Sequence, residues 1–166
     1  MNDYPWYGLA NGDDLQQGDL LLACPFDRVD GIGIADRKNF NVVIMSHSCD
    51  LAHDKLDMIQ VCPFWDLERL AKDVEFFRAK RGWEELRRGS LPGYHLLNRC
   101  MLPEQPTDFL VIDFRMQFAV EFAQLKSLAS SQKPRLRLLS PYREHLAQAL
   151  ARFYMRVGLP VDIPAF

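Results

Sequence analysis

The chain has 166 residues, of which 48% are hydrophobic and 25% charged, a composition typical of one compact domain that can bury its own core. Its formal net charge of −2 argues against nonspecific nucleic-acid binding, because such binding depends on positive charge that neutralises phosphates. The first residues lack the basic and apolar regions of a signal peptide, and no uncharged apolar run approaches the roughly 18 residues of a membrane span. We therefore expect a cytoplasmic protein that does not enter a membrane.

Charge is divided unevenly along the chain. Residues 1–60 carry 4 Lys or Arg and 10 Asp or Glu, whereas residues 61–166 carry 16 and 12. Opposite charges on one domain indicate either a self-complementary surface, as in a homo-oligomer, or a basic face that meets an acidic partner. The four cysteines, without a signal peptide, are expected to be reduced thiols or metal ligands and not a disulfide framework.

The segment 15–64 has the pattern of a strand-rich unit. Its first apolar run is expected to end at Pro25, because proline cannot donate to a strand ladder. A second strand is possible over 31–35, although two glycines weaken that prediction. Stronger strand patterns cover 41–46 and 57–64.

From Asp66 the apolar spacing changes to that of a helix, which indicates a helical insertion over 66–89. We predict an amphipathic helix over 67–80, with Asp66 as its N-cap and its end near Gly82. A short second helix over 83–88 follows.

The segment 94–139 is expected to return to strands. Strands are predicted over 94–98 and over 108–114, the latter continuing to 120, and a short helix is predicted to end near Ser130. The last strand, 135–139, alternates as a half-exposed strand does.

The C-terminal helix has the clearest boundaries. Ser140 is a good N-cap, Pro141 suits the first helical position, and Gly158 marks the end, so we predict a helix over 141–157. No linker divides residues 1–166, which are therefore predicted to form a single α+β domain. The helix should pack on the sheet or on a second copy of the chain through its apolar stripe, which comprises Tyr142, Leu146, Ala149, Leu150, Phe153 and Val157.

Three segments resemble a known plan: Gln17-Gly18-Asp19-Leu20-Leu21, Val42-Val43-Ile44-Met45-Ser46 and Ile59-Gln60-Val61-Cys62-Pro63. Their order is similar to that in MazF/PemK-type small barrels, which are SH3-like and whose best-known members are RNA-cleaving toxins. Cys49-Asp50-Leu51 also resembles part of a Ser-x-x-Cys-Asp-Leu signature of uncharacterised bacterial proteins. The resemblance implies an SH3-like barrel over 15–64 and an architecture related to toxin–antitoxin or defence proteins.

The chain departs from that family at its functional positions. Lys38-Asn39-Phe40-Asn41 stand where the toxins have an Arg-Pro pair, and Cys62-Pro63-Phe64 offers no counterpart to their later catalytic threonine. Ribonuclease activity is therefore not implied by the resemblance.

A cluster of reactive side chains follows the strand at 41–46. In an enzyme, Cys49 would be the attacking thiolate, His47 the base and Asp50 the group that orients it. The base could instead come from a distant histidine, and the orienting carboxylate from a neighbouring aspartate; these alternatives are His95, His145 and Asp54.

Two other interpretations of this cluster remain. His47, Cys49 and His53 could bind zinc with Cys24 or Cys62 as a fourth ligand, but their spacing is not a standard zinc signature. We therefore expect neither a metal nor another cofactor. In the third interpretation Cys49 is a buried apolar filler, and the polar residues beside it, Ser46, Ser48 and Asp50, satisfy backbone groups of a tight turn.

A second candidate site is basic. Arg135 and Arg137 share one face of the last predicted strand, and three further arginines lie on the final helix, namely Arg143, Arg152 and Arg156. Such a patch could contact RNA or an acidic protein. Alternatively, its arginines pair with the acidic half of the same chain.

We therefore expect a module that binds a protein or RNA. An enzyme centred on Cys49, of hydrolase or nuclease type, is the alternative, and a zinc-stabilised module is the third interpretation.

Overall fold

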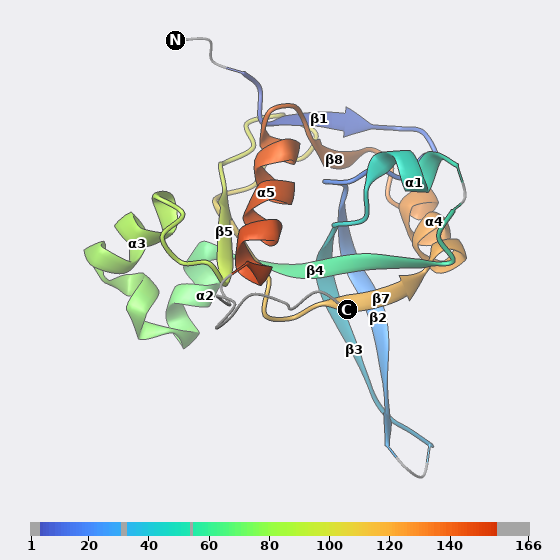
Figure 1. Cartoon of the computed structure of the whole chain (residues 1–166), viewed down its shortest axis with the longest axis horizontal. Helices are drawn as coiled ribbons and strands as arrows, with labels where there is room; N and C mark the ends of the chain where they lie inside the picture. The colour runs from blue at the N-terminus through green and yellow to red at the C-terminus, as the bar shows by residue number, and fades with distance from the viewer. Residues whose placement is uncertain (1–3, 31–32, 54, 156–166) are drawn as a thin grey trace, which may run out of the picture.

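The computed structural model describes residues 4–30, 33–53 and 55–155, and Figure 1 shows their arrangement. These residues form a six-stranded sheet and a two-stranded sheet, and every strand pairing is antiparallel. Helices pack on both sheets. The predicted α+β class is therefore confirmed.

The elements alternate between short strands and short helices. In chain order they are β1 (Tyr7–Ala10), β2 (Leu20–Asp30), β3 (Gly33–Ile44), α1 (Ser48–Ala52), β4 (Met58–Asp66), α2 (Leu67–Asp73), the 3₁₀ helix η1 (Glu75–Arg78), α3 (Lys80–Arg87), β5 (Tyr94–Leu97), β6 (Leu110–Asp113), β7 (Phe118–Glu121), α4 (Phe122–Ser131), β8 (Arg135–Leu138) and α5 (Tyr142–Tyr154).

The larger sheet has the order β2-β3-β4-β6-β5, and β7 also pairs with β4. The smaller sheet consists of β1 and β8, and it touches β2 through a bridge between Asp19 and Arg137. Among the described residues these strands do not close into a barrel. The closed barrel expected over 15–64 is thus an open, antiparallel sheet.

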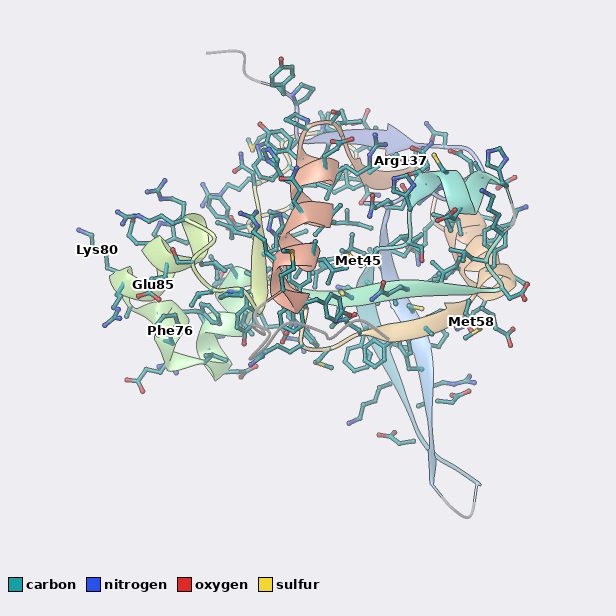
Figure 2. The ribbon with its side chains drawn as sticks, viewed as in Figure 1. Met45, Met58, Phe76, Lys80, Glu85 and Arg137 are labelled. Carbon is teal, nitrogen blue, oxygen red and sulfur yellow. The ribbon has the colours of Figure 1, made fainter. Side chains whose placement is uncertain are left out.

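The larger sheet has a hydrophobic core on each face. Met45 lies within one core and is 3% exposed, whereas Met58 at the end of β4 is 49% exposed (Figure 2). One core receives Leu146 from α5, and the other receives Leu51 from α1 and Leu125 from α4. The first core comprises Tyr7, Leu20, Val43, Met45, Cys62, Phe64, Leu97, Cys100, Leu110, Ile112, Phe114, Leu136, Leu138 and Leu146.

The C-terminal helix packs as predicted within the same chain. Leu146 is fully buried, and Ala149, Leu150 and Phe153 pack against the first core. The helix begins one residue later than predicted, because Pro141 occupies the N-cap position without a side-chain capping bond. It ends at Tyr154 with Met155 as its C-cap, before the predicted end at residue 157, and residues 156–157 lie outside the described residues. Among these residues no helix is long and apolar enough to cross a membrane.

Pro25 does not end the first strand, because β2 continues to Asp30. A strand interior tolerates this proline since β2 lies at the edge of the larger sheet, where a missing N–H breaks no second ladder. β3 begins at Gly33, inside the weakly predicted 31–35 strand, and it continues without interruption through the strongly predicted 41–46 segment to Ile44.

The helical insertion is divided more finely than the sequence pattern predicts. Val74 is extended (φ −122°, ψ 102°) and separates α2 from η1, so the single helix expected over 67–80 does not form. Gly82 lies inside α3 and not at a helix end. A Cβ at Gly82 would lie 2.0 Å from the Phe76 carbonyl oxygen, so the close approach of η1 to α3 requires glycine there.

The β2–β3 hairpin extends away from the body as a two-stranded ribbon (Figure 1). We call residues 24–30 and 33–40 of this hairpin the arm. Along the arm β3 pairs with β2, from Cys24 opposite Phe40 to Asp30 opposite Gly33. β4 pairs with β3 only at Val42–Ile44, so within the described residues the arm has no third strand.

Candidate functional site

The candidate catalytic segment follows the most deeply buried part of β3. Val42, Val43 and Ile44 are fully buried and pair with β2 on one side and β4 on the other, so the strand predicted over 41–46 is a central strand that ends at Ile44. The chain then turns, and α1 carries Cys49 and Asp50. Leu51 is 4% exposed and anchors α1 in the second core.

The hydroxyl oxygens of the two serines in this segment accept hydrogen bonds from backbone N–H groups. Ser46 Oγ accepts a hydrogen bond from the Gln60 N–H at 2.9 Å, and Ser48 Oγ accepts one from the Gln17 N–H at 3.1 Å. The side-chain amide of Gln17 donates to the Met45 carbonyl at 2.7 Å. Ser46 and Ser48 therefore hold the turn in place, as the third interpretation of the cluster expected.

His47 and Asp50 do not form a triad with Cys49. His47 occupies the N-cap of α1, where its Nδ1 accepts a hydrogen bond from the Cys49 backbone N–H at 3.4 Å. The Asp50 carboxylate lies 3.8 Å from Lys55 Nζ. Among the described residues no hydrogen bond joins the Cys49 thiol to an imidazole. The geometry thus shows no general base for Cys49.

Cys49 is nevertheless exposed, so its interpretation as a buried apolar filler is wrong. It lines a surface cleft of about 550 Å³ between α1, α4 and the loop that precedes β2. The other thiols are buried. Burial raises the pKa of Cys24 to about 11, and burial together with the Asp113 carboxylate raises the pKa of Cys62 to about 12.

Polar groups around Cys49 give the cleft a mixed character. His53 lines it from the end of α1, Lys126 from α4, and Asp13 and Asp14 from the loop. Lys126 also lies over the Phe122 ring, with Nζ 5.8 Å from the ring centroid. The cleft can thus present a thiol, an imidazole and charges of both signs to a ligand.

The expected alternative zinc ligands are not gathered. Among the described residues no three His, Cys, Asp or Glu side chains are placed to hold a metal ion. Cys24 and Cys62 lie in the two separate cores, whereas Cys49 is at the surface. The structure therefore offers no support for the zinc-stabilised interpretation.

The distant histidines lie together, but away from Cys49. His95 on β5 and His145 on α5 line a different cavity of about 390 Å³, with Trp6 and Trp83 among its walls. Burial, with the charges of His145 and Arg152, lowers the pKa of His95 to about 4. Neither histidine lines the Cys49 cleft, and the candidate Asp54 lies outside the described residues.

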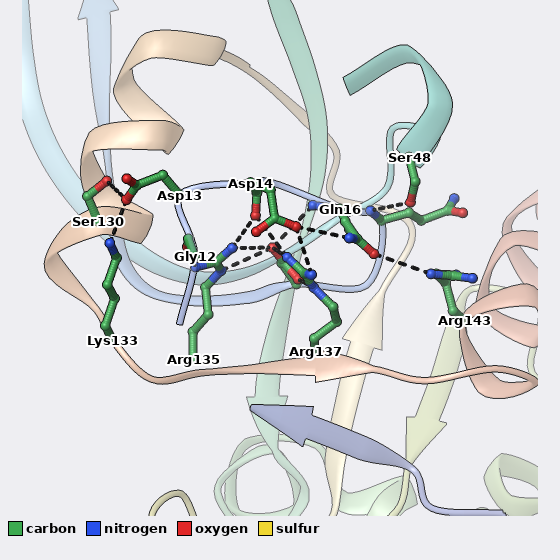
Figure 3. A network of polar contacts seen from close by, with 12 residues as sticks. Gly12, Asp13, Asp14, Gln16, Ser48, Ser130, Lys133, Arg135, Arg137 and Arg143 are labelled. Carbon is green, nitrogen blue, oxygen red and sulfur yellow. Dashed lines mark hydrogen bonds and ion pairs between the residues drawn. The ribbon is translucent and has the colours of Figure 1, made fainter. Parts of the chain in front are cut away.

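Two of the candidate binding arginines are turned into the protein (Figure 3). The carboxylate of Asp19 is completely buried and accepts hydrogen bonds from both Arg135 and Arg137. The side chain of Arg135 is 1% exposed and that of Arg137 is 14% exposed. β8 is thus more buried than the half-exposed strand that its alternation predicted, because its arginines neutralise a buried carboxylate.

The same two arginines hold the loop that precedes β2. Arg135 donates to the Gly12 carbonyl at 2.8 Å and to the Asp14 carbonyl, and Arg137 donates to the Asp14 carboxylate at 3.0 Å. Lys133 Nζ donates to the Asp13 carboxylate at 2.6 Å. Because Asp13 and Asp14 line the Cys49 cleft, this network fixes one wall of it (Figure 3).

The remaining arginines do not extend these two into one basic surface. Arg143 donates to Glu144 at 2.9 Å and its side chain is 30% exposed, whereas Arg152 is exposed on α5. Arg156 lies outside the described residues. Arg135 and Arg137 pair with aspartates of the acidic half of the chain, as the alternative interpretation predicted. That interpretation did not predict that one of these aspartates, Asp19, is buried.

No protein-family model and no curated protein sequence matches this chain.

Proposed function

We propose that this chain is a protein-binding module and that the arm is its contact element. The observation that carries the proposal is the one-sided pairing of β3. This strand pairs with β2 along the arm, but it meets β4 only at Val42–Ile44. The backbone groups on its other edge therefore lack a ladder partner between Gly33 and Asn41 among the described residues.

Residues 36–39 of the arm have little packing of their own. Asp36, Arg37, Lys38 and Asn39 are all exposed, although successive residues of a strand point to opposite faces. These four side chains are therefore uncovered, whereas Phe26 and Phe40 of the arm pack against Phe118 and the second core. Two-stranded ribbons without a packed face have marginal stability in water, so a partner that covers the arm would stabilise it.

Backbone orientation identifies Asn39 as a residue of the free edge. It pairs with Pro25, which has no N–H, and the Pro25 carbonyl accepts a hydrogen bond from the Gln124 side chain at 3.1 Å. We infer that this pair exchanges no backbone hydrogen bonds, so the N–H and C=O of Asn39 point away from β2. An extended segment of a partner could bind them as an added strand.

Protein is a better supported partner than RNA. Arg135 and Arg137, which made RNA contact plausible, are committed to the buried Asp19 carboxylate. Without them, the described part of the candidate basic patch is reduced to Arg143, which pairs with Glu144, and Arg152, too few cations to neutralise several phosphates. Strand addition over a few residues implies an affinity on the order of micromolar.

The decisive variants change the arm and leave both cores intact. Asp27 and Arg37 are opposite each other in the ladder. Replacing residues 28–36 by Asn-Gly therefore connects them through a two-residue hairpin loop and shortens the arm. In the full-length chain, Asn39→Pro removes the N–H of the free edge, and Asn39→Ala is its matched control because it keeps that N–H.

Affinity purification from the source lysate, with each variant as bait, identifies the partner that depends on the arm. Titration of that purified partner into each variant by calorimetry then measures the affinity. We expect the shortened arm and Asn39→Pro to lose binding and Asn39→Ala to retain it, with all melting temperatures close to that of the parent. Equal affinity of Asn39→Pro and Asn39→Ala would refute strand addition.

We also propose that the fold is an opened relative of the SH3-like barrels of MazF/PemK type. The proposal is supported by the position of Gly18-Asp19, which resembles the Gly-Asp of that family. Here the Gly18 carbonyl accepts a hydrogen bond from the Leu138 N–H at 3.0 Å, so β8 lies against the start of β2. A relation to toxin–antitoxin or defence proteins is part of this proposal.

A second candidate function is thiol chemistry at Cys49. The observation that favours it is the exposed thiol in a cleft that His53 also lines. This function would be supported if a substrate-sized electrophile modified the Cys49 thiol at a higher rate than it modifies free cysteine. Equal rates would indicate an ordinary surface thiol.

A further inference from the structure

The cavity of about 390 Å³ that His95 and His145 line lies at the outer edge of β5, the last strand of the larger sheet. His95 and Leu96 are neighbours in β5, so their side chains point to opposite faces of the strand. Because both residues line the cavity, it extends around the outer edge of β5. Its apolar and aromatic wall comprises Trp6, Trp83, Leu86, Leu96 and Phe109. A hollow of this size with a few polar groups has the usual form of a small-ligand site.

Aromatic neighbours hold the two tryptophans of this wall in place. Trp6 stacks on Tyr142 of α5, with ring centroids 3.7 Å apart and an interplanar angle of 10°, and Tyr142 meets His145 edge-on at 6.0 Å. Trp83 of α3 meets Phe109 at 4.9 Å with an interplanar angle of 69°. The cavity therefore offers preformed aromatic surfaces on which a flat ring packs favourably.

The outer edge of β5 supplies a hydrogen-bond donor and an acceptor. The Phe114 N–H donates to the Gly93 carbonyl at 2.9 Å, so these residues form a hydrogen-bonded pair at the end of the β5–β6 ladder. Such pairs alternate with non-hydrogen-bonded pairs along an antiparallel ladder. His95 therefore bonds to β6 through its backbone, whereas the N–H and C=O of Leu96 point to the outer edge, where no described strand pairs with them.

This edge is too short for an added strand. The Tyr94 N–H already donates to the Leu91 carbonyl at 3.0 Å, and β5 ends at Leu97. Leu96 is thus the one residue of β5 whose N–H and C=O are both free of backbone partners among the described residues. In an extended residue these two groups point the same way. They match the adjacent C=O and N–H of a lactam in a small ring.

The other polar groups of the cavity favour an uncharged ligand. The His95 imidazole makes no hydrogen bond with any described residue, and neither of its ring nitrogens is fully buried, so a ligand can reach them. Burial, with the charges of His145 and Arg152, lowers the pKa of His95 to about 4, so its ring is neutral at pH 7. Arg87, the permanent charge on the wall, is paired with Glu84 at 3.0 Å.

We propose that this cavity binds an uncharged, flat heterocycle with a lactam edge, that is, a ring N–H beside a ring C=O. The ring C=O accepts a hydrogen bond from the Leu96 N–H, and the ring N–H donates to the Leu96 carbonyl. The faces of the heterocycle pack against the tryptophans of the wall, and a further polar atom of the ring meets His95. The cavity contains no residue of the arm or of the Cys49 cleft, so this proposal and those above can fail separately.

Two ligands of almost the same shape test the lactam edge: quinolin-2-one and N-methylquinolin-2-one, in which a methyl group replaces the N–H. Each is titrated into the ¹⁵N-labelled protein, where the indole N–H groups of the three tryptophans give separate signals. We expect quinolin-2-one to bind about fivefold or more tightly than its N-methyl form, the usual size of one hydrogen bond. It should shift the Leu96 amide and the indole signals of Trp6 and Trp83, while Trp65, which contacts Phe40 of the arm, stays unchanged.

Inosine carries the same lactam edge on a ribose and tests the source of the ring. Tighter binding of inosine than of quinolin-2-one would assign the site to nucleosides, and the reverse to free heterocycles.

A pair of variants tests the strand edge itself. Leu96→Pro removes the outward N–H, and Leu96→Ala is its matched control, because it shortens the side chain but keeps that N–H. Leu96→Pro should bind quinolin-2-one about fivefold more weakly than Leu96→Ala. The ligand comparison uses the unaltered chain, so it decides the proposal even if Leu96→Pro does not fold. The proposal is overturned if quinolin-2-one causes no saturable shift, if it and its N-methyl form bind alike, if Trp65 shifts in place of Trp6 and Trp83, or if two folded Leu96 variants bind equally.

Discussion

Asp19→Asn is a small change in side-chain shape that should nevertheless destabilise this protein strongly. It replaces a carboxylate with a neutral amide of nearly the same shape, so packing changes little. The carboxylate is 0% exposed, and it accepts hydrogen bonds from the Gln16 N–H at 3.2 Å and from Arg135 and Arg137 at 3.0 Å. Without it, Arg135 stays buried as an uncompensated cation.

Removal of one partner from a buried ion pair costs about 3 to 5 kcal/mol. Such a loss is a large part of the roughly 5 to 15 kcal/mol that stabilises a typical domain. Asp19→Asn should therefore lower the free energy of unfolding by about 3 kcal/mol or more, and the loop that Arg135 holds at Gly12 should become more mobile.

Urea unfolding at pH 7, followed by tryptophan fluorescence and far-UV circular dichroism, measures this loss. Asp27→Asn is the control, because Asp27 makes a similar two-point contact with Arg37, at 2.6 and 3.0 Å, but on the surface of the arm. The control should change stability little and should lose even that effect in high salt. If the two variants differ by less than about 1 kcal/mol, Asp19 is not the buried electrostatic anchor described above.

Three further substitutions test other parts of the structure. One thiol per chain should react rapidly with Ellman's reagent in the native protein, and Cys49→Ser should abolish that fast phase, because Cys49 is the exposed thiol; a fast phase that persists would contradict this. Because burial lowers the pKa of His95 to about 4 from an ordinary 6.5, the unfolded chain binds the proton first as pH falls. The free energy of unfolding should then rise by up to about 3 kcal/mol from pH 4 to pH 6.5, and His95→Gln should flatten that slope; an unchanged slope would show that His95 is not responsible. Gly82→Ala should destabilise by more than the roughly 1 kcal/mol range of ordinary helix propensity, since the new Cβ meets the Phe76 carbonyl, and thermal unfolding that shows no loss would contradict that close approach.

The elements with strong periodicity were predictable from the sequence. The apolar run that ends at Ile44 is fully buried, and the stripe around Leu146 packs on the first core with Leu146 itself buried, as each pattern indicates. Val74 shows where this reasoning fails. Its side chain fits a helical stripe, but tertiary packing of η1 against α3 around Gly82 breaks the helix there.

The candidate sites were harder to predict, because their character depends on long-range partners. Arg135 and Asp19 are far apart in sequence and meet only when β8 lies against β2. The acidic first half and basic second half of the chain were the available signal, although charge counts do not say which pair is buried. Nothing in the local sequence of Trp83 or His95 indicated that both would line one cavity.

The central claim, that the free edge of β3 receives a strand from a partner protein, is tested most directly by amide hydrogen exchange. The amides of Arg37 and Asn39 should exchange rapidly in the isolated chain, because they point to the free edge and lack a ladder partner, whereas that of Lys38 between them faces β2. With the arm-dependent partner bound, we predict slow exchange at Asn39 and its neighbours on that edge and little change at the Cys49 cleft. Protection that is confined to the cleft or to α5, with residues 36–40 unchanged, would contradict the claim.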